Sequence, residues 1–210
     1  IHDELITMVV AGHETVAAAL SWTLMLLAQH QEAQERVREE LRRLPDGVPM
    51  LAAAESAPWL HAVISEALRL YPPAWVVSRR ATSPDVLGGV EVPTGTTAII
   101  SPWVVHRRPS SWPDPTTFRP ERFASGQGTA ARADYIPFGL GPRLCIGREL
   151  ALGELAVVLG EVLARYVVAV PEPAWRPPAP RALLAAHPCG GMPLRLSPVG
   201  DEVAEGGAAA

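Results

Sequence analysis

The chain has 210 residues, 48% of them hydrophobic and 19% charged, a composition that fits one or two globular domains with a sizeable core. It excludes an intrinsically disordered protein. A net charge of -4 and a pI near 5.9 give no electrostatic reason to expect binding to nucleic acid or to a membrane surface, so small neutral partners fit better.

The cysteines and the first residues indicate where the protein works. Cys145 and Cys189 are interpreted as separate thiols in a reducing compartment, hence a cytoplasmic protein. No signal peptide is visible, and the longest apolar run, residues 16–28, is too short to span a bilayer. The chain has no initiator methionine and opens inside a helical pattern, so we expect a fragment. Every basic residue is arginine, which favours a bacterial source.

Apolar periodicity predicts helices in the first third of the chain. Leu5, Val9, Val16 and Leu20 recur at helical spacing, which predicts one long helix over residues 1–29. A polar amphipathic helix follows over residues 31–44. A third helix is predicted over residues 57–70, with Pro58 in its first turn and Pro72 beyond its end.

The remaining elements are shorter. Residues 86–100 look like a small hairpin, and residues 101–144 form a long irregular stretch rich in proline. A helix is predicted over residues 147–165, then a second hairpin around 181–197 with His187 and Cys189 at its tip, and a disordered tail over residues 199–210. The expected fold is mainly α with small β-hairpins.

Cys145 lies in the segment FGLGPRLCIG, residues 138–147, which is rich in glycine. Taken alone, a free cysteine is most often a small buried hydrophobe. A thiolate that ligates a metal instead needs backbone freedom and donors directed at its sulfur, and the glycines provide that freedom. The helix that follows would stabilise the thiolate through the positive end of its dipole.

These residues match the signature F-x-x-G-x-R-x-C-x-G, and the chain resembles the cytochrome P-450 family of haem-thiolate monooxygenases. Three weaker segments agree in the family's order: AGHET at 11–15, the E-x-x-R pair Glu66 and Arg69, and PERF at 120–123. The resemblance implies the C-terminal, haem-binding half of the family fold, with the N-terminal half missing. Residues 1–198 would form this partial domain, with the long helix on the distal side of the haem, the cysteine loop at 137–147 and the helix 147–165 on the proximal side.

The resemblance also implies roles around the cofactor, heme b. Cys145 would be the proximal iron ligand, with Gly147 in its loop and Phe138 packed beside the sulfur. Arg143 and Arg79 would meet the haem propionates, because guanidinium groups pair well with carboxylates.

On the distal side, the resemblance implies that Gly12 and Thr15 open a groove for dioxygen and that Glu14 and Thr15 relay protons. The plainer alternative for Thr15 is a hydroxyl bonded back to the carbonyl of Ala11. Ala11 itself would lie in the substrate pocket.

Two further groups of residues follow from the resemblance. One is a structural triad, in which Glu66 would be paired with Arg69 and Arg122. The other is a substrate pocket with an apolar lining, which indicates a hydrophobic substrate and includes Trp75, Val76 and Val77.

The implied activity is insertion of one oxygen atom from dioxygen into a hydrophobic organic substrate. The electrons would come from NAD(P)H through a ferredoxin and its reductase or through a flavoprotein reductase. Two alternatives stay open: a peroxide-driven peroxygenase, which the Glu14 and Thr15 pair argues against, and a non-catalytic remnant that folds poorly or only binds haem.

Overall fold

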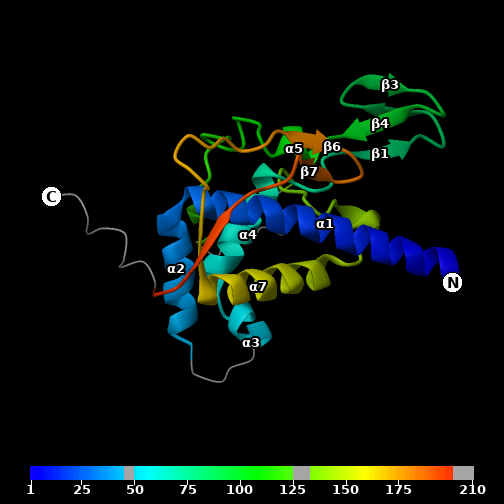
Figure 1. Cartoon of the computed structure of the whole chain (residues 1–210). Helices are drawn as coiled ribbons and strands as arrows, with labels where there is room; N and C mark the ends of the chain where they lie inside the picture. The colour runs from blue at the N-terminus through cyan, green and yellow to red at the C-terminus, as the bar shows by residue number, and fades with distance from the viewer. Residues whose placement is uncertain (45–49, 125–132, 201–210) are drawn as a thin grey trace.

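The computed structural model describes residues 1–44, 50–124 and 133–200 (Figure 1). The helices are α1 (His2–Gln29), α2 (Gln31–Arg42), α3 (Met50–Glu55), α4 (Pro58–Leu70), α5 (Pro102–Val105), α6 (Glu121–Ala124), the short 3-10 turn η2 (Gly141–Arg143) and α7 (Arg148–Arg165). The strands are β1 (Val77–Arg80), β2 (Asp85–Leu87), β3 (Val90–Val92), β4 (Thr97–Ile100), β5 (Tyr166–Ala169), β6 (Pro180–Ala182), β7 (Ala186–Pro188) and β8 (Arg195–Pro198).

The core lies where α1, α4 and α7 pack together, with α2 alongside them. The C-terminal half of α1 is buried there, and Trp22 stacks on Tyr71 with ring centroids 4.3 Å apart. The N-terminal half of the same helix extends away from the core, and Leu5 and Val9 on it are exposed (Figure 1). Val16, by contrast, belongs to the core and Leu20 packs against it, so the apolar stripe of α1 is only partly open.

Two side chains of α2 replace missing backbone partners in neighbouring elements. Gln34 is fully buried and bonds both the amide (2.9 Å) and the carbonyl (2.8 Å) of Val168, as a neighbouring strand would. The Glu40 carboxylate accepts from the backbone amides of Trp59 (2.9 Å) and Leu60 (3.0 Å) in the first turn of α4. Helix α4 is therefore capped from another helix, not by its own sequence.

The strands form separate antiparallel pairs: β1 with β4, β2 with β3, β5 with β8 and β6 with β7. The mainly helical fold with small sheets was predicted, but two of these pairings were not. Residues 97–100 pair with β1 and do not belong to the predicted hairpin over 86–100. Residues 195–198 pair with β5, so the second hairpin is confined to β6 and β7.

By length and composition alone, α1 is apolar enough to cross a membrane. Its C-terminal half packs against α4, α7, β5 and β7, but only 22% of its most apolar window is buried. The helices predicted over 57–70 and 147–165 run from Pro58 to Leu70 and from Arg148 to Arg165, while α3 was not predicted. Of the predicted tail over 199–210, residues 201–210 lie outside the described residues.

Candidate functional site

Cys145 lies in a tight loop that its glycines make possible. Gly139 (φ 78°) and Gly141 (φ 72°) adopt positive φ, a conformation that other L-residues rarely take. The amide of Cys145 donates to the carbonyl of Phe138 (3.0 Å), which closes the loop immediately before α7. The cysteine itself is exposed.

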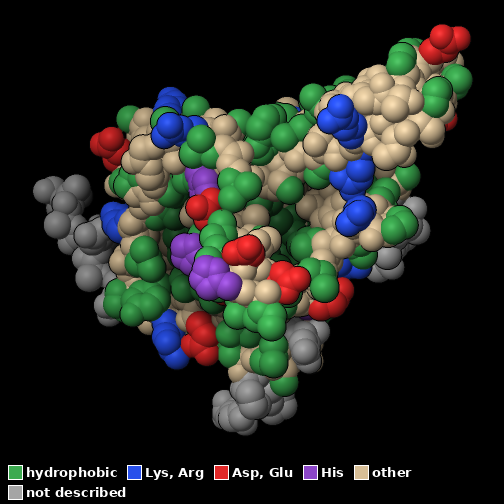
Figure 2. Space-filling model, turned by 90° about the vertical axis from the view of Figure 1, so that its right-hand side faces the viewer, with side chains coloured by type: hydrophobic (Ala, Val, Ile, Leu, Met, Phe, Trp, Pro, Cys, Tyr) green, Lys and Arg blue, Asp and Glu red, His purple; other side chains and the backbone are tan. Residues whose placement is uncertain are grey.

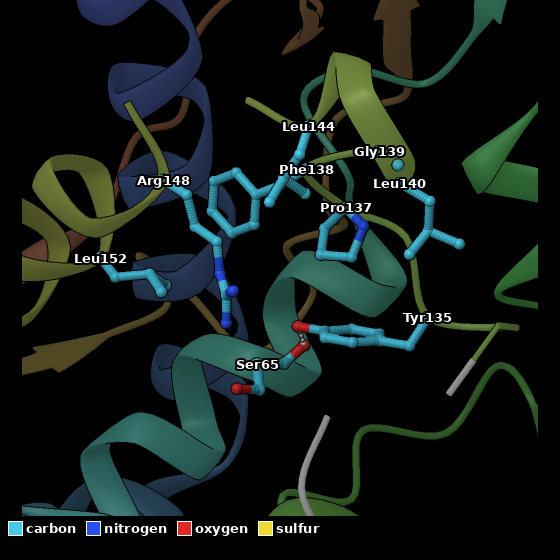
Figure 3. Close-up of a pocket in the computed structure, with 10 residues that line it drawn as sticks. Ser65, Tyr135, Pro137, Phe138, Gly139, Leu140, Leu144, Arg148 and Leu152 are labelled. Carbon is cyan, nitrogen blue, oxygen red and sulfur yellow. Dashed lines mark hydrogen bonds between the residues drawn. The ribbon is translucent and has the colours of Figure 1, made fainter. Parts of the chain in front are cut away.

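The inner side of this loop packs against α4 and α7. Phe138 is half-buried, and it lines a cavity of about 150 Å³ together with Ser65 of α4 and Arg148 of α7 (Figure 3). The Tyr135 hydroxyl donates to the carbonyl of Ser65 (2.9 Å), which holds the start of the loop against α4. The cysteine loop therefore packs on two helices of the core, α4 and α7.

On α1, Thr15 forms the backbone contact that was considered for it. Its hydroxyl donates to the carbonyl of Ala11 (2.7 Å), and its side chain is partly exposed. Ala11 and Gly12 are exposed, and a Cβ added at Gly12 would meet no atom within 4 Å. The surface of the helix is open at Gly12, and the groove expected at Gly12 and Thr15 stays a prediction.

Glu14 lies beside the second hairpin, formed by β6 and β7, which is the terminal hairpin of the described chain. Its Oε2 is 3.6 Å from Nε2 of His187 in β7. His187 and Cys189 were predicted at the tip of this hairpin, but the tip is residues 183–185, and His187 lies within β7. The contact with Glu14 could not be predicted because it joins residues far apart in the sequence.

Arg143 in η2 and Arg79 in β1 are exposed. Arg79 donates to the carbonyl of Ser78 (2.8 Å). Within residues 1–44, 50–124 and 133–200, neither guanidinium has a carboxylate within ion-pair distance. Both are available to an anionic group.

The structure brings Glu66, Arg69 and Arg122 together. Glu66 and Arg69 are fully buried, and two parallel bonds of 2.7 and 2.8 Å join them. Arg122 Nε lies 3.4 Å from Oε1 of Glu66, and burial lowers the pKa of Arg122. The remaining donors of Arg69 reach backbone carbonyls of the irregular stretch, at His106, Pro115 and Thr117.

No role was predicted for His106, which is fully buried against the end of α4. Its Nε2 accepts from the amide of Ile136 (2.8 Å) and its Nδ1 donates to the carbonyl of Arg69 (3.2 Å). Burial lowers the pKa of His106 to about 4, so the ring is neutral. It joins the end of α4 to the residues that lead into the cysteine loop.

The segment predicted to line a substrate pocket is held against the terminal hairpin. Trp75, Val76 and Val77 are half-buried, and the Trp75 indole donates to the carbonyl of Leu183 (2.9 Å) at the hairpin tip. Leu183 and Leu184 at this tip are exposed apolar side chains that sequence reasoning did not single out. Consecutive leucines between two short strands were the available signal.

The residues at this site limit how a metal could be held. Across the part of the chain that the structure describes, no three His, Cys, Asp or Glu side chains gather at metal-binding distance. A metal at Cys145 would therefore have fewer than three such protein ligands and would need further ligands, which a prosthetic group can supply.

Comparisons with known proteins agree with one another. The family model described as Cytochrome P450 matches residues 1–191. Cytochrome P450 714C3 from rice (Oryza sativa subsp. japonica) is 41% identical over 91% of this chain and 38% of its own length. Cyclooctatin synthase from Streptomyces melanosporofaciens is 35% identical over 94% of this chain and 42% of its own length.

A solved structure gives the same result for the fold. The crystal structure of CYP175A1 from Thermus thermophillus superposes with a TM-score of 0.75 at 38% identity, covering 91% of this chain and 44% of that chain. The chain thus spans about two fifths of the length of the proteins that it matches.

Proposed function

The chain belongs to the cytochrome P450 family, and we propose that the whole protein inserts one oxygen atom from dioxygen into a hydrophobic organic substrate. The observation that carries this proposal is Cys145, exposed in a loop with glycines at positive φ and followed directly by α7. A structural cysteine would be buried.

The family implies a haem, and the residues present fit one. Cys145 supplies a single exposed sulfur, as a metal already held by a macrocycle requires. Leu144 and Ile146 beside it are exposed apolar side chains, and Gly12 leaves open space on α1. Arg143 and Arg79 have no carboxylate partner among the described residues, and we propose that they bind the propionates of heme b.

When bound, the haem supplies the activation of dioxygen, and the residues of this chain supply protons and shape. The Thr15 hydroxyl already donates to Ala11, and its oxygen has lone pairs left to accept a hydrogen bond. The half-exposed carboxylate of Glu14 can exchange protons with solvent. We propose that Glu14 and Thr15 pass protons from solvent to the reacting centre.

The proposed substrate is apolar. Trp75, Val76 and Val77 are apolar and half-buried, and Leu183 and Leu184 add exposed apolar surface where the hairpin meets Trp75. A relative from Arabidopsis thaliana named cytokinin hydroxylase (37% identical) is consistent with hydroxylation as the type of reaction.

We further propose electron supply from NAD(P)H through a ferredoxin and its reductase or a flavoprotein reductase, in the cytoplasm of a bacterium. The relatives from Streptomyces and Thermus support a bacterial source. The bacterial source and the cytoplasmic location are proposals that do not follow from membership of the family.

Isotopically labelled dioxygen tests the proposal in the whole protein. Incubation with NAD(P)H, a redox partner and an apolar substrate should place one labelled oxygen atom in the product. A peroxygenase would instead take its oxygen from hydrogen peroxide and need no NAD(P)H. A protein that binds no haem, or that binds haem and forms no product with either oxidant, would be the non-catalytic remnant.

A further inference from the structure

The terminal hairpin of β6 and β7 is fixed to the rest of the fold through Ala186. The buried indole of Trp22 in α1 donates to the carbonyl of Ala186 (2.7 Å), and the amide of Ala186 donates to the carbonyl of Pro73 (2.9 Å). Trp75 holds the tip through Leu183 (2.9 Å). Because both polar groups of the Ala186 backbone are bonded, the position of the next residue, His187, is set as well.

The hairpin lies along one face of α1. Glu14, Ala18 and Trp22 are four residues apart in turn, so they share this face. Ala18 is buried, and its small side chain allows β7 to approach the helix. Ala186 contacts the helix at Trp22, and His187 reaches it at Glu14.

His187 and Glu14 lie in contact without a direct hydrogen bond. The 3.6 Å between Nε2 and Oε2 exceeds hydrogen-bond length, and the side chains are 29% and 42% exposed. Pairs with this exposure contribute little to folding stability.

Few other charges act on this carboxylate. On α1, the neighbours of Glu14 at helical spacing are Val10, Ala11, Ala17 and Ala18, all uncharged. The titratable groups nearby are His13, next to Glu14 in α1, and Arg181 of β6, which is paired in register with His187. Among the described residues, only His187 lies within ion-pair distance of Glu14.

We propose that His187 is a positioning residue for Glu14: it holds the carboxylate on the hairpin side of α1, one residue before Thr15. This inference rests on the proposed role of Glu14 in delivering protons. It links proton delivery to the hairpin whose tip contacts Trp75, so a displacement of Trp75 would reach the proton path through one strand.

The first test measures how much reducing power is lost as hydrogen peroxide in the whole, haem-loaded protein. Glu14→Gln should raise the peroxide released per NAD(P)H consumed, and His187→Ala should raise it about two- to tenfold. The double variant should lose no more than Glu14→Gln alone, because His187 acts only through Glu14. Cys189→Ala, an exposed change on the same hairpin, is the matched control and should leave coupling unchanged.

Rescue and a structural signal separate positioning from general damage. His187→Arg, which places a permanent cation beside Glu14, should restore coupling, whereas His187→Leu should not. In the haem-free protein, Glu14→Gln should move the NMR signals of the His187 ring, and Glu4→Gln should not.

The outcomes are distinct. Additive losses in the double variant, or equal coupling in His187→Leu and His187→Arg, would overturn the inference. If Glu14→Gln changes coupling and His187→Ala does not, the inference alone fails. If Glu14→Gln has no effect, the proposed role of Glu14 fails and the inference fails with it.

Discussion

At the scale of single residues, the side chains behind the cysteine loop are held by complete sets of polar contacts. His106 uses both ring nitrogens, and Arg69 uses its guanidinium on Glu66 and on three backbone carbonyls. Near this pair, Arg107 donates to the carbonyl of Leu70 and lies over the ring of Trp103, 3.6 Å from its centroid. These residues carry no proposed chemistry, yet they set the position of the loop that does.

The buried ring of His106 predicts a loss of stability in acid. Its pKa is lowered from 6.5 to about 4, so the fold favours the neutral ring, and this contribution is complete above pH 6.5 and lost as the pH falls towards 4. The loss should amount to about 3 kcal/mol. Urea unfolding at pH 7, 5.5 and 4.5 should show it in the natural protein and much less in His106→Gln, which cannot titrate. Equal pH dependence in the two proteins would contradict this account.

Thr15 carries a prediction on coupling. Without the hydroxyl, the proton path proposed through Glu14 loses its last member, so Thr15→Ala should keep consuming NAD(P)H while product falls and peroxide rises. Thr7→Ala is the matched control, because Thr7 makes the same bond to the carbonyl four residues before it (2.7 Å) and lies nearer the exposed end of α1. Tight coupling in Thr15→Ala would mean that Thr15 is only a helical residue.

At the scale of elements, the long helices could be predicted because their signals are local. The periodicity of α1, the proline at the start of α4 and the glycines before α7 are all read within one segment. The pairings of β1 with β4 and of β5 with β8 could not be predicted, because each joins two short strands that are separated by other elements. The hydrogen bonds between Glu40 and the first turn of α4 and between Gln34 and Val168 also join distant segments. They could not be predicted from the sequence pattern either.

The residues of the candidate site also differ in whether local sequence was enough to predict them. Cys145, Phe138, Arg143 and Gly147 could be named because they lie in one short segment, while the role of His187 depends on how a distant hairpin packs on α1. The contacts of His106 likewise join three separate segments of the chain, so no one segment predicts them.

The Glu66 cluster joins α4, α6 and the loop between them, and it predicts a large cost for breaking it. Glu66→Ala removes the partner of buried Arg69, the nearby charge for Arg122 and the acceptor of the Arg119 amide (2.9 Å). Unfolding stability should fall by roughly 3 to 5 kcal/mol, and haem should not be retained. Glu39→Ala, an exposed carboxylate of α2, should cost under about 0.5 kcal/mol. A soluble, haem-loaded and active Glu66→Ala protein would refute this role.

At the scale of the whole molecule, apolar side chains gather on one exposed end. The N-terminal half of α1 and the cysteine loop both present them, and Figure 2 shows apolar side chains among charged ones on one face of the molecule. The exposed apolar residues are Leu5, Ile6, Met8, Val9 and Val10 of α1 and Leu140, Leu144 and Ile146 of the loop. Soluble monomers rarely leave so many neighbouring apolar side chains of one helix uncovered.

These exposed side chains predict the behaviour of the 210-residue chain expressed by itself with a haem precursor. It should be poorly soluble, bind haem weakly or not at all, and show no monooxygenase activity with any redox partner. Size-exclusion chromatography and haem content measure this directly. A monomeric, haem-saturated product would show that the open face of α1 needs no further cover.

The central claim is that Cys145 provides the thiolate for a haem, and the absorption spectrum of the reduced, carbon-monoxide-bound whole protein tests it most directly. The natural protein and Cys189→Ala should both show the red-shifted band typical of thiolate ligation, because Cys189 is an exposed thiol beyond β7 with no part in the loop. Cys145→Ala and Cys145→His should both lose that band. A normal band in either Cys145 variant would contradict the assignment.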